Sequence, residues 1–195
     1  MNLYTKNIGK SFSGVNVLRN VNFSLEPGEV HALVGENGAG KSTFVKVLSG
    51  VYTPTIGNIY LDDQKVLINT PIAAQKNGIS LIHQEPQSFS HLSVAENIFM
   101  GHMDGSNFSR VKWKDINKSS EKILSSIGLE IDPKNIMEGL SIADQQMIEI
   151  AGALSKNSKV LIMDEPTSPL TPNEVGKLFD IVKQLKDQGM AIIFI

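Results

Sequence analysis

The chain has 195 residues, of which 41% are hydrophobic and 19% charged, a composition typical of a folded protein with a full core. The formal charge of -2 gives no reason to expect nucleic acid as a partner, and the absence of cysteine excludes disulfides and thiolate metal sites. No apolar run is long enough to span a membrane, and the first residues lack the apolar block of a signal peptide, so we expect a cytoplasmic chain.

The first thirty residues are expected to form an antiparallel hairpin region. Val21, Phe23 and Leu25 alternate with polar neighbours, and Pro27-Gly28 is typical of a turn. On periodicity alone Phe12 is best interpreted as a core residue. Beside a bound nucleotide, an aromatic side chain in this region could instead stack on adenine.

Residues 35–43 fit the pattern G-x-x-x-x-G-K-[ST] of a phosphate-binding loop. Glycines let the backbone curl until its N–H groups converge on phosphate oxygens, and a helix that follows adds the positive end of its dipole. The motif assigns Lys41 to the β and γ phosphates, Ser42 to Mg²⁺ and Thr43 to a further phosphate contact. The expected nucleotide-binding residues of the loop are Gly35, Glu36, Asn37, Gly38, Ala39, Gly40, Lys41, Ser42 and Thr43.

The neighbours of this loop favour the same interpretation. Residues 30–34 are a mostly apolar run suited to a buried strand, and Phe44, Val47 and Leu48 have helical spacing before Gly50. A chance match to the motif is expected in roughly one chain of this length in a hundred. Because strand, loop and helix are the setting that the motif needs, we predict a nucleoside triphosphate site.

The next segments alternate between strand and helix. They are expected to form a turn at 53–57, a strand at 58–62, a helix from Thr70-Pro71 to Gly78 and a strand at 79–83. Gln84 follows at the carboxyl end of that last strand, where ligands of open α/β sheets sit. It is therefore placed to touch Mg²⁺ or water near a γ-phosphate, although by itself it is better explained as a loop residue.

From about 88 to 139 the pattern indicates helices. Ser93 and Glu96 have the capping-box spacing, and residues 113–127 form an amphipathic pattern that Gly128 ends. Residues 101–110 between these helices are polar and loop-like. We predict one ATPase domain with a core at 1–87 and 156–195 and an inserted helical subdomain at 88–155.

Ser141 has the position of an N-cap, with Asp144 three residues later and a buried face at Ile148, Ala151 and Leu154. A purely structural cap explains this segment well. The two interpretations are compatible, because a helix N-terminus that carries a serine is also an anion site.

Residues 160–163 are apolar and predict a central strand, with Asp164 and Glu165 at its carboxyl end. Two carboxylates beside a buried strand favour a cation, so we assign Asp164 to Mg²⁺ and Glu165 to accepting a proton from attacking water. A solvated acidic turn is the alternative. Beyond it, Thr171-Pro172 begin a helix that ends at Gly189, with its apolar face at Val175, Leu178, Phe179, Val182 and Leu185, and 190–195 form a further buried strand.

The chain resembles the ATP-binding cassette of ABC transporters in five features and in their order. These are an N-terminal aromatic, a phosphate loop, Gln84 after a strand, Leu140-Ser141 before a helix and Asp164-Glu165 after a strand. The resemblance implies a P-loop α/β fold with a mostly parallel sheet, an antiparallel N-terminal region and a helical subdomain. It also implies that Phe12 stacks on adenine, that the Gln84 segment touches a membrane permease, and that Ser141 contacts the γ-phosphate bound by a second cassette. Catalysis would then depend on Glu165, Lys41 and Gln84, and Mg²⁺ on Ser42, Gln84 and Asp164.

A narrower resemblance is to the cassettes of bacterial importers for simple sugars such as ribose, galactose and xylose. Residues 140–150 have the pattern Leu-Ser-x-Ala followed by Gln-Gln and Met-x-Glu-Ile, which is typical of this subgroup. The sequences that begin at His83 and at His91 are also similar to those of the subgroup. The resemblance implies an ATPase that works with a permease, a second cassette and, indirectly, a sugar-binding protein at the cytoplasmic face of the membrane. It does not indicate which sugar is carried.

The sequence also departs from that family. Ile142 and Ala143 replace the usual signature glycines, Asp144 stands where glutamine is common, and Pro169 replaces a small residue. The family's Ser-His pair after a strand like 190–195 is absent, so we expect a cassette that lacks its C-terminal part and turns ATP over slowly. The alternatives are a regulatory cassette with little catalysis and a non-transport ABC ATPase, although the latter usually carries a longer insertion before the signature.

Overall fold

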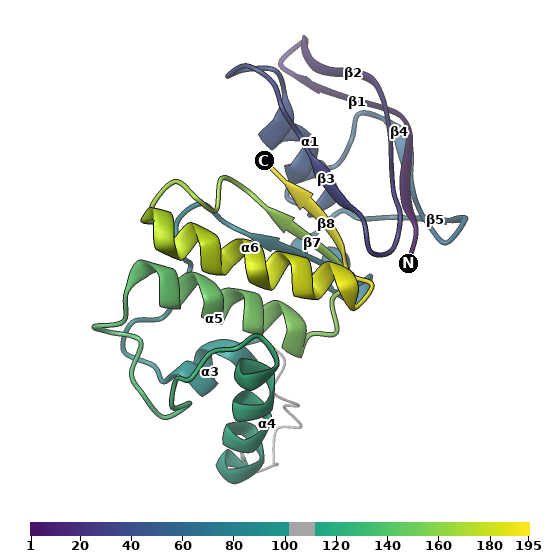
Figure 1. Cartoon of the computed structure of the whole chain (residues 1–195). Coiled ribbons are helices and arrows are strands. Elements are labelled where there is room, and N and C mark those ends of the chain that lie inside the picture. The colour runs from purple at the N-terminus through teal and green to yellow at the C-terminus, as the bar shows by residue number, and fades with distance from the viewer. Residues whose placement is uncertain (102–111) are drawn as a thin grey trace. The chain divides into compact units, whose positions relative to one another are not determined.

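The computed structural model describes residues 1–101 and 112–195, and in these ranges it has an α/β fold with two four-stranded sheets and six helices (Figure 1). The strands are β1 (Leu3–Phe12), β2 (Val15–Leu25), β3 (Val30–Ala32), β4 (Ile56–Leu61), β5 (Gln64–Val66), β6 (Ile79–Ile82), β7 (Val160–Met163) and β8 (Ala191–Phe194). The helices are α1 (Lys41–Leu48), α2 (Pro71–Lys76), α3 (Val94–Phe99), α4 (Trp113–Ser126), α5 (Ile142–Ser155) and α6 (Pro172–Asp187). The predicted α/β class is confirmed.

The chain divides into two compact units. The first comprises 1–81, 158–165 and 185–195, and the second comprises 82–157 and 166–184. The subdomain limits at 88 and 155 remain a prediction. Apart from Gly101, the loop expected at 101–110 lies outside the described residues.

The first sheet belongs to the first unit, is antiparallel and has the order β2-β1-β4-β5. The predicted N-terminal hairpin is confirmed, since Leu3 on β1 pairs with Leu25 on β2. The predicted turn after β2 is confirmed too: Glu29 N–H donates to Glu26 O at 3.1 Å, and Gly28 has a φ of 72°. β5 was not expected from the sequence, because three residues give too short a pattern.

The second sheet has the order β3-β8-β7-β6, and the β3–β8 and β8–β7 pairs are parallel. β7 is the central strand expected from its composition, and all four of its residues are fully buried. The expectation of a buried strand at 30–34 is wrong in part. β3 ends at Ala32, so Val34 lies beyond the strand, and the side chains of Val30 and Val34 are 39% and 91% exposed.

One hydrophobic cluster joins both sheets of the first unit to α1. It contains side chains from β1, β2 and β4 of the antiparallel sheet, from β7 and β8 of the parallel sheet, and Phe44, Val45, Val47 and Leu48 of α1. α1 begins directly after the phosphate loop. The residues of α1 after its first turn thus pack in the core and hold in place the N-terminus that would face a phosphate.

The second unit is helical, and local signals define its helices. Ser93 and Glu96 form the predicted capping box at the start of α3, and Ser141 accepts a hydrogen bond from Asp144 N–H at the start of α5. α4 ends near the predicted Gly128, which has a φ of 72°. One prediction for α6 is wrong: Phe179 was assigned to its apolar face but is 49% exposed.

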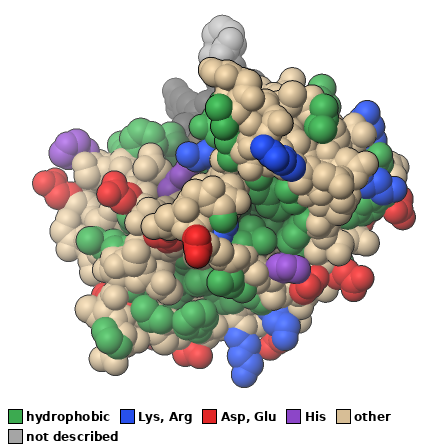
Figure 2. All heavy atoms as spheres, turned by 90° about the horizontal axis from the view of Figure 1, so that it is seen from above, with side chains coloured by type: hydrophobic (Ala, Val, Ile, Leu, Met, Phe, Trp, Pro, Cys, Tyr) green, Lys and Arg blue, Asp and Glu red, His purple; other side chains and the backbone are tan. Residues whose placement is uncertain are grey.

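Charged side chains of both signs lie interspersed on the face shown in Figure 2, together with exposed hydrophobic ones. Among the described residues, no helix combines the length and the apolar character that crossing a membrane requires.

Candidate functional site

The phosphate loop connects the carboxyl end of β3 to the first turn of α1. Gly40 stands at the N-cap of α1 with a φ of 92°, a conformation that L side chains rarely adopt. No side chain caps this helix start, and its first turn contains no acidic residue. The first N–H groups of α1 are therefore available to an anionic ligand, which the helix dipole also favours.

The side chain of Lys41 reaches back over the loop. Its Nζ donates to Gly35 O at 2.7 Å and to Glu36 O at 3.2 Å, and within the loop Ala39 N–H donates to Glu36 O at 3.1 Å. Residues 35–39 are exposed. Lys41 has three donors and these two bonds use two of them, so the ammonium group can donate to a phosphate while it braces the loop.

Asp164 and Glu165 follow β7, and the strand register relates them to the phosphate loop. Ala32 on β3 pairs with Phe194 on β8, and Phe194 pairs with Met163 on β7. Leu33 N–H continues the ladder by donating to Phe194 O at 2.8 Å. Because these strands are parallel and in register, the loop and the carboxylate pair leave the sheet at the same edge, at their carboxyl ends.

The two carboxylates differ in burial. Asp164 is half-buried and Glu165 is exposed. The assignment of Asp164 to Mg²⁺ and of Glu165 to a proton acceptor remains a prediction. Glu165 also has a φ of 46°, which costs a residue other than glycine roughly 1–2 kcal/mol. Such strain persists where the surrounding structure imposes it, and it is commoner at functional sites than elsewhere.

The donors present fit a magnesium ion bound together with a nucleotide. Ser42 offers a hydroxyl in the first turn of α1 and Asp164 a carboxylate after β7, and oxygen ligands of these kinds suit Mg²⁺. Among the described residues there is no group of three or more His, Cys, Asp or Glu side chains that could hold a metal ion. An ion here would therefore depend on phosphate oxygens for much of its coordination.

Phe12 lies at the end of β1 and is 37% exposed, so its interpretation as a core residue is wrong. Its ring and that of Tyr52 form a T-shaped pair with 5.1 Å between centroids, and Lys10 Nζ lies 5.0 Å from the Phe12 centroid. Tyr52 was not singled out from the sequence, since no local pattern connects it to Phe12. Whether Phe12 receives an adenine ring remains a prediction.

The two other predicted site residues belong to the second unit. Gln84 is exposed, and its Nε2 donates to Ser168 Oγ at 3.4 Å. The Ser141 hydroxyl donates to Asp144 Oδ2 at 2.9 Å and accepts from Asp144 N–H at 3.1 Å. The structural interpretation of Ser141 as an N-cap is thus confirmed, and its role toward a phosphate remains a prediction.

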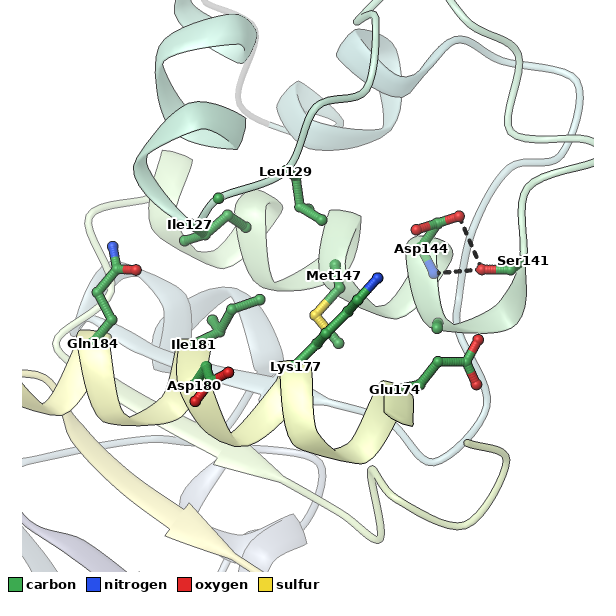
Figure 3. A pocket seen from close by; sticks show the side chains of 12 residues that line it. Ile127, Leu129, Ser141, Asp144, Met147, Glu174, Lys177, Asp180, Ile181 and Gln184 are labelled. Carbon is green, nitrogen blue, oxygen red and sulfur yellow. Dashed lines mark hydrogen bonds between the residues drawn. The ribbon is translucent and has the colours of Figure 1, made fainter. Parts of the chain in front are cut away.

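The second unit also contains a cavity of about 450 Å³ (Figure 3). It lies among α5, α6 and the segment that follows α4, with Ile127, Met147 and Ile181 pointing into it and charged side chains of α6 beside them. Ser141 is among the described residues that line this cavity, and no residue of the phosphate loop is among them.

A half-buried carboxylate in α5, that of Glu149, was missed. Glu149 follows Ile148 and precedes Ile150 and Ala151, and an acid within so apolar a run was the available signal. Its Oε1 accepts a hydrogen bond from Gln87 N–H, and burial raises its pKa to about 7.

Comparisons with known proteins agree on one family. The model of the ABC transporter family matches residues 18–168. The chain is 48% identical over 193 residues to a ribose import ATP-binding protein of Streptomyces avermitilis and 49% identical to one of Streptomyces coelicolor. Both alignments include 99% of this chain but only 38% of the relative, so the chain spans well under half the length of these proteins.

Solved structures give the same result. A nucleotide-free ATP-binding cassette from an ABC transporter matches the whole chain with a TM-score of 0.87 and 26% identity, over 81% of its own length. Another cassette, in its ADP conformation, matches with a TM-score of 0.85 and 26% identity over 80% of its length.

Proposed function

The chain belongs to the ABC transporter family, and we propose that it binds and hydrolyses ATP to drive the import of a simple sugar. The names of its relatives support the sugar class, because they are import ATP-binding proteins for ribose or for ribose, galactose and methyl galactoside. As the chain spans 38% of the first relatives' length, the substrate and the partners are carried over from them as part of this proposal.

The strand register is the observation that carries the proposal. The phosphate loop after β3 and Asp164-Glu165 after β7 leave the sheet at one edge, in strands joined through β8. ATP hydrolysis requires groups that hold the phosphates and a group that accepts a proton from water. A sheet edge that carries both kinds of group supports a hydrolytic role rather than mere anion binding.

The proposed roles follow from the chemistry of each side chain. The N–H groups of the loop and Lys41 would bind the phosphates and offset their charge. Ser42, Asp164 and Gln84 would hold Mg²⁺, which supplies further charge neutralisation when bound. Glu165 would accept the proton of the attacking water, and Phe12 would stack on adenine.

Transport requires partners outside this chain. We propose a second cassette, whose nucleotide would meet Ser141, and a membrane permease that would contact the Gln84 segment, with a sugar-binding protein acting through the permease. The chain would then work at the cytoplasmic face of the membrane.

Nucleotide titration of the 195-residue chain tests the core of the proposal. Wild type should bind MgATP, and Lys41→Ala should weaken binding at least about tenfold, because it removes a charge-assisted contact. Lys65→Ala is the matched control, since Lys65 is an exposed lysine on β5 of the same unit. Equal affinities for wild type and Lys41→Ala, with both folded, would refute the assigned site.

A regulatory cassette with little catalysis is the second candidate, and one hydrogen bond favours it. The Ser141 hydroxyl already donates to Asp144, so it is not free for a γ-phosphate, and the Asp144 carboxylate would repel that phosphate. Phosphate release by the complete gene product with its permease separates the two candidates. Transport-coupled release supports the motor, whereas tight binding without release supports the regulator.

A further inference from the structure

Two hydrogen-bonded links join the segment after Gln84 to helix α5 within the second unit. The backbone N–H of Gln87 donates to Glu149 Oε1. The hydroxyl of Ser88 donates to Gln145 Oε1 at 2.9 Å. Glu149 and Gln145 are four residues apart on α5 and so lie on one face of the helix.

The Gln145 amide continues the second link toward the start of α5. Its Nε2 donates to Leu140 O at 3.0 Å, and Leu140 is the residue before Ser141. One planar amide thus connects Ser88, four residues after Gln84, with the backbone next to Ser141. A relay of this kind transmits a displacement at either end because the amide has few ways to accommodate it.

The Glu149 link begins at the surface, because Gln87 is exposed, and the carboxyl group of Glu149 extends from there into the unit. Glu149 Oε2 is buried and has no hydrogen-bond partner, and the same is true of both amide atoms of Gln146 one turn earlier. Burial raises the pKa of Glu149 to about 7, against the lowering effects of the Gln87 N–H and of Lys156. Because desolvating a carboxyl group is costly, its presence here calls for a structural explanation, and the contacts offer the hydrogen bond that Glu149 accepts from Gln87.

We propose that Glu149 and Gln145 are positioning residues that clamp the Gln84 segment to the helix beginning at Ser141. The clamp makes these two proposed nucleotide contacts respond together, since a shift of segment 84–88 pulls on α5 through both links. This inference rests on the proposed function for its consequence in catalysis. The clamp itself is a property of the second unit and can be tested without nucleotide.

Backbone amide exchange measured by NMR on the 195-residue chain tests the clamp. In Glu149→Ala, Gln87 N–H loses its acceptor and should exchange on the order of tenfold to a hundredfold faster than in wild type. Glu149→Gln keeps a carbonyl acceptor of the same reach and should restore most of the protection. Glu121→Ala, which removes an exposed glutamate from α4, is the matched control and should leave Gln87 unchanged.

A milder variant keeps the test decisive should Glu149→Ala fold poorly. Ser88→Ala deletes one half-buried hydroxyl at the edge of the unit and should accelerate exchange around residue 88 while the cooperative unfolding transition persists. Wild-type exchange at Gln87 in a folded Glu149→Ala, or exchange in Glu149→Gln as fast as in Glu149→Ala, would overturn the clamp.

Steady-state turnover of MgATP by the complete gene product with its permease tests the positioning role. Because neither residue is assigned to nucleotide, Gln145→Ala and Glu149→Ala should lower kcat about 2- to 30-fold and leave KM nearly unchanged, with Glu149→Gln close to wild type. Unchanged kcat in both alanine variants would overturn the positioning role. Wild type without measurable turnover would contradict the proposed function instead, and the exchange at Gln87 would still support or overturn the clamp.

Discussion

Replacing the glycines of the phosphate loop one at a time separates what the fold needs from what a phosphate needs. Gly40 has a φ of 92°, and a Cβ there would lie 2.9 Å from Leu18 Cδ2 and 3.2 Å from Val17 O. The backbone conformation costs an alanine roughly 1–2 kcal/mol, and the forced contacts cost about 1–3 kcal/mol. We therefore expect Gly40→Ala to lower the free energy of unfolding by about 2–5 kcal/mol.

The two other glycines of the motif isolate the separate effects. Gly38 has a φ of 85° but no atom within 4 Å of its ideal Cβ, so Gly38→Ala should cost only the backbone component, about 1–2 kcal/mol. Gly35 has no positive φ, and its Cβ would meet Ala39 Cβ at 3.4 Å and Lys41 Cδ at 3.9 Å. Gly35→Ala should change stability by about 0.5 kcal/mol or less and still weaken MgATP binding, because the methyl group enters the loop beside Lys41.

Urea unfolding and nucleotide titration of the three variants give the two readouts. An m-value equal to that of wild type shows that only stability has changed. Equal destabilisation in Gly38→Ala and Gly40→Ala would refute the reasoning, because the contacts of the new Cβ with β2 would then contribute nothing to the loss of unfolding free energy. It would also fail if Gly35→Ala bound MgATP as tightly as wild type.

Three further predictions concern carboxylates. Glu165→Gln should lower ATP turnover about 10² to 10⁴-fold, as expected for a general base, with MgATP affinity retained; fast hydrolysis in this variant would contradict the assignment. Asp144→Gln should free the Ser141 hydroxyl and raise the turnover of paired cassettes, whereas Asp144→Glu serves as the charge-retaining control and should not. Burial raises the pKa of Glu149 from 4.5 to about 7, so the stabilisation from its proton is complete below pH 4.5 and is lost as the pH rises through 7. At 1.36 kcal/mol per pKa unit this is a loss of about 3 kcal/mol, which urea unfolding across that pH range should show in wild type; an identical profile in Glu149→Gln would contradict it.

Local chemistry made much of the fold predictable. Thr70 accepts a hydrogen bond from Ala73 N–H at the start of α2, and Ser93 and Glu96 cap α3, so these two helices begin where the sequence carries their caps. Gly78 and Gly189 follow their helices with φ of 75° and 87°. These signals are reliable because the interacting groups lie within four residues of each other.

Features that depend on distant segments were predicted less well. The exposure of Val30 depends on which strand pairs with β3, and the exposure of Phe179 depends on what packs against α6. The bond between Gln87 and Glu149 joins residues 62 positions apart. No periodicity encodes such a pairing, although an acid within the apolar face of α5 indicated that one was needed.

The pairing of the phosphate loop with Asp164-Glu165 was predictable from two local motifs and one topological rule. Each segment follows an apolar run, and parallel strands bring their carboxyl ends to one edge. The sequence did not indicate the left-handed backbone of Glu165, because residues other than glycine rarely adopt that conformation and glutamate is not enriched in it.

The most direct measurement of the central claim is paramagnetic broadening of backbone amides by Mn²⁺-ATP in the 195-residue chain. The account predicts that amides of residues 37–43 and of Asp164 and Glu165 broaden together, and that Lys41→Ala abolishes both effects. Broadening of the loop with unaffected amides at Asp164 and Glu165 would contradict the claim that the two segments share one nucleotide and its metal ion.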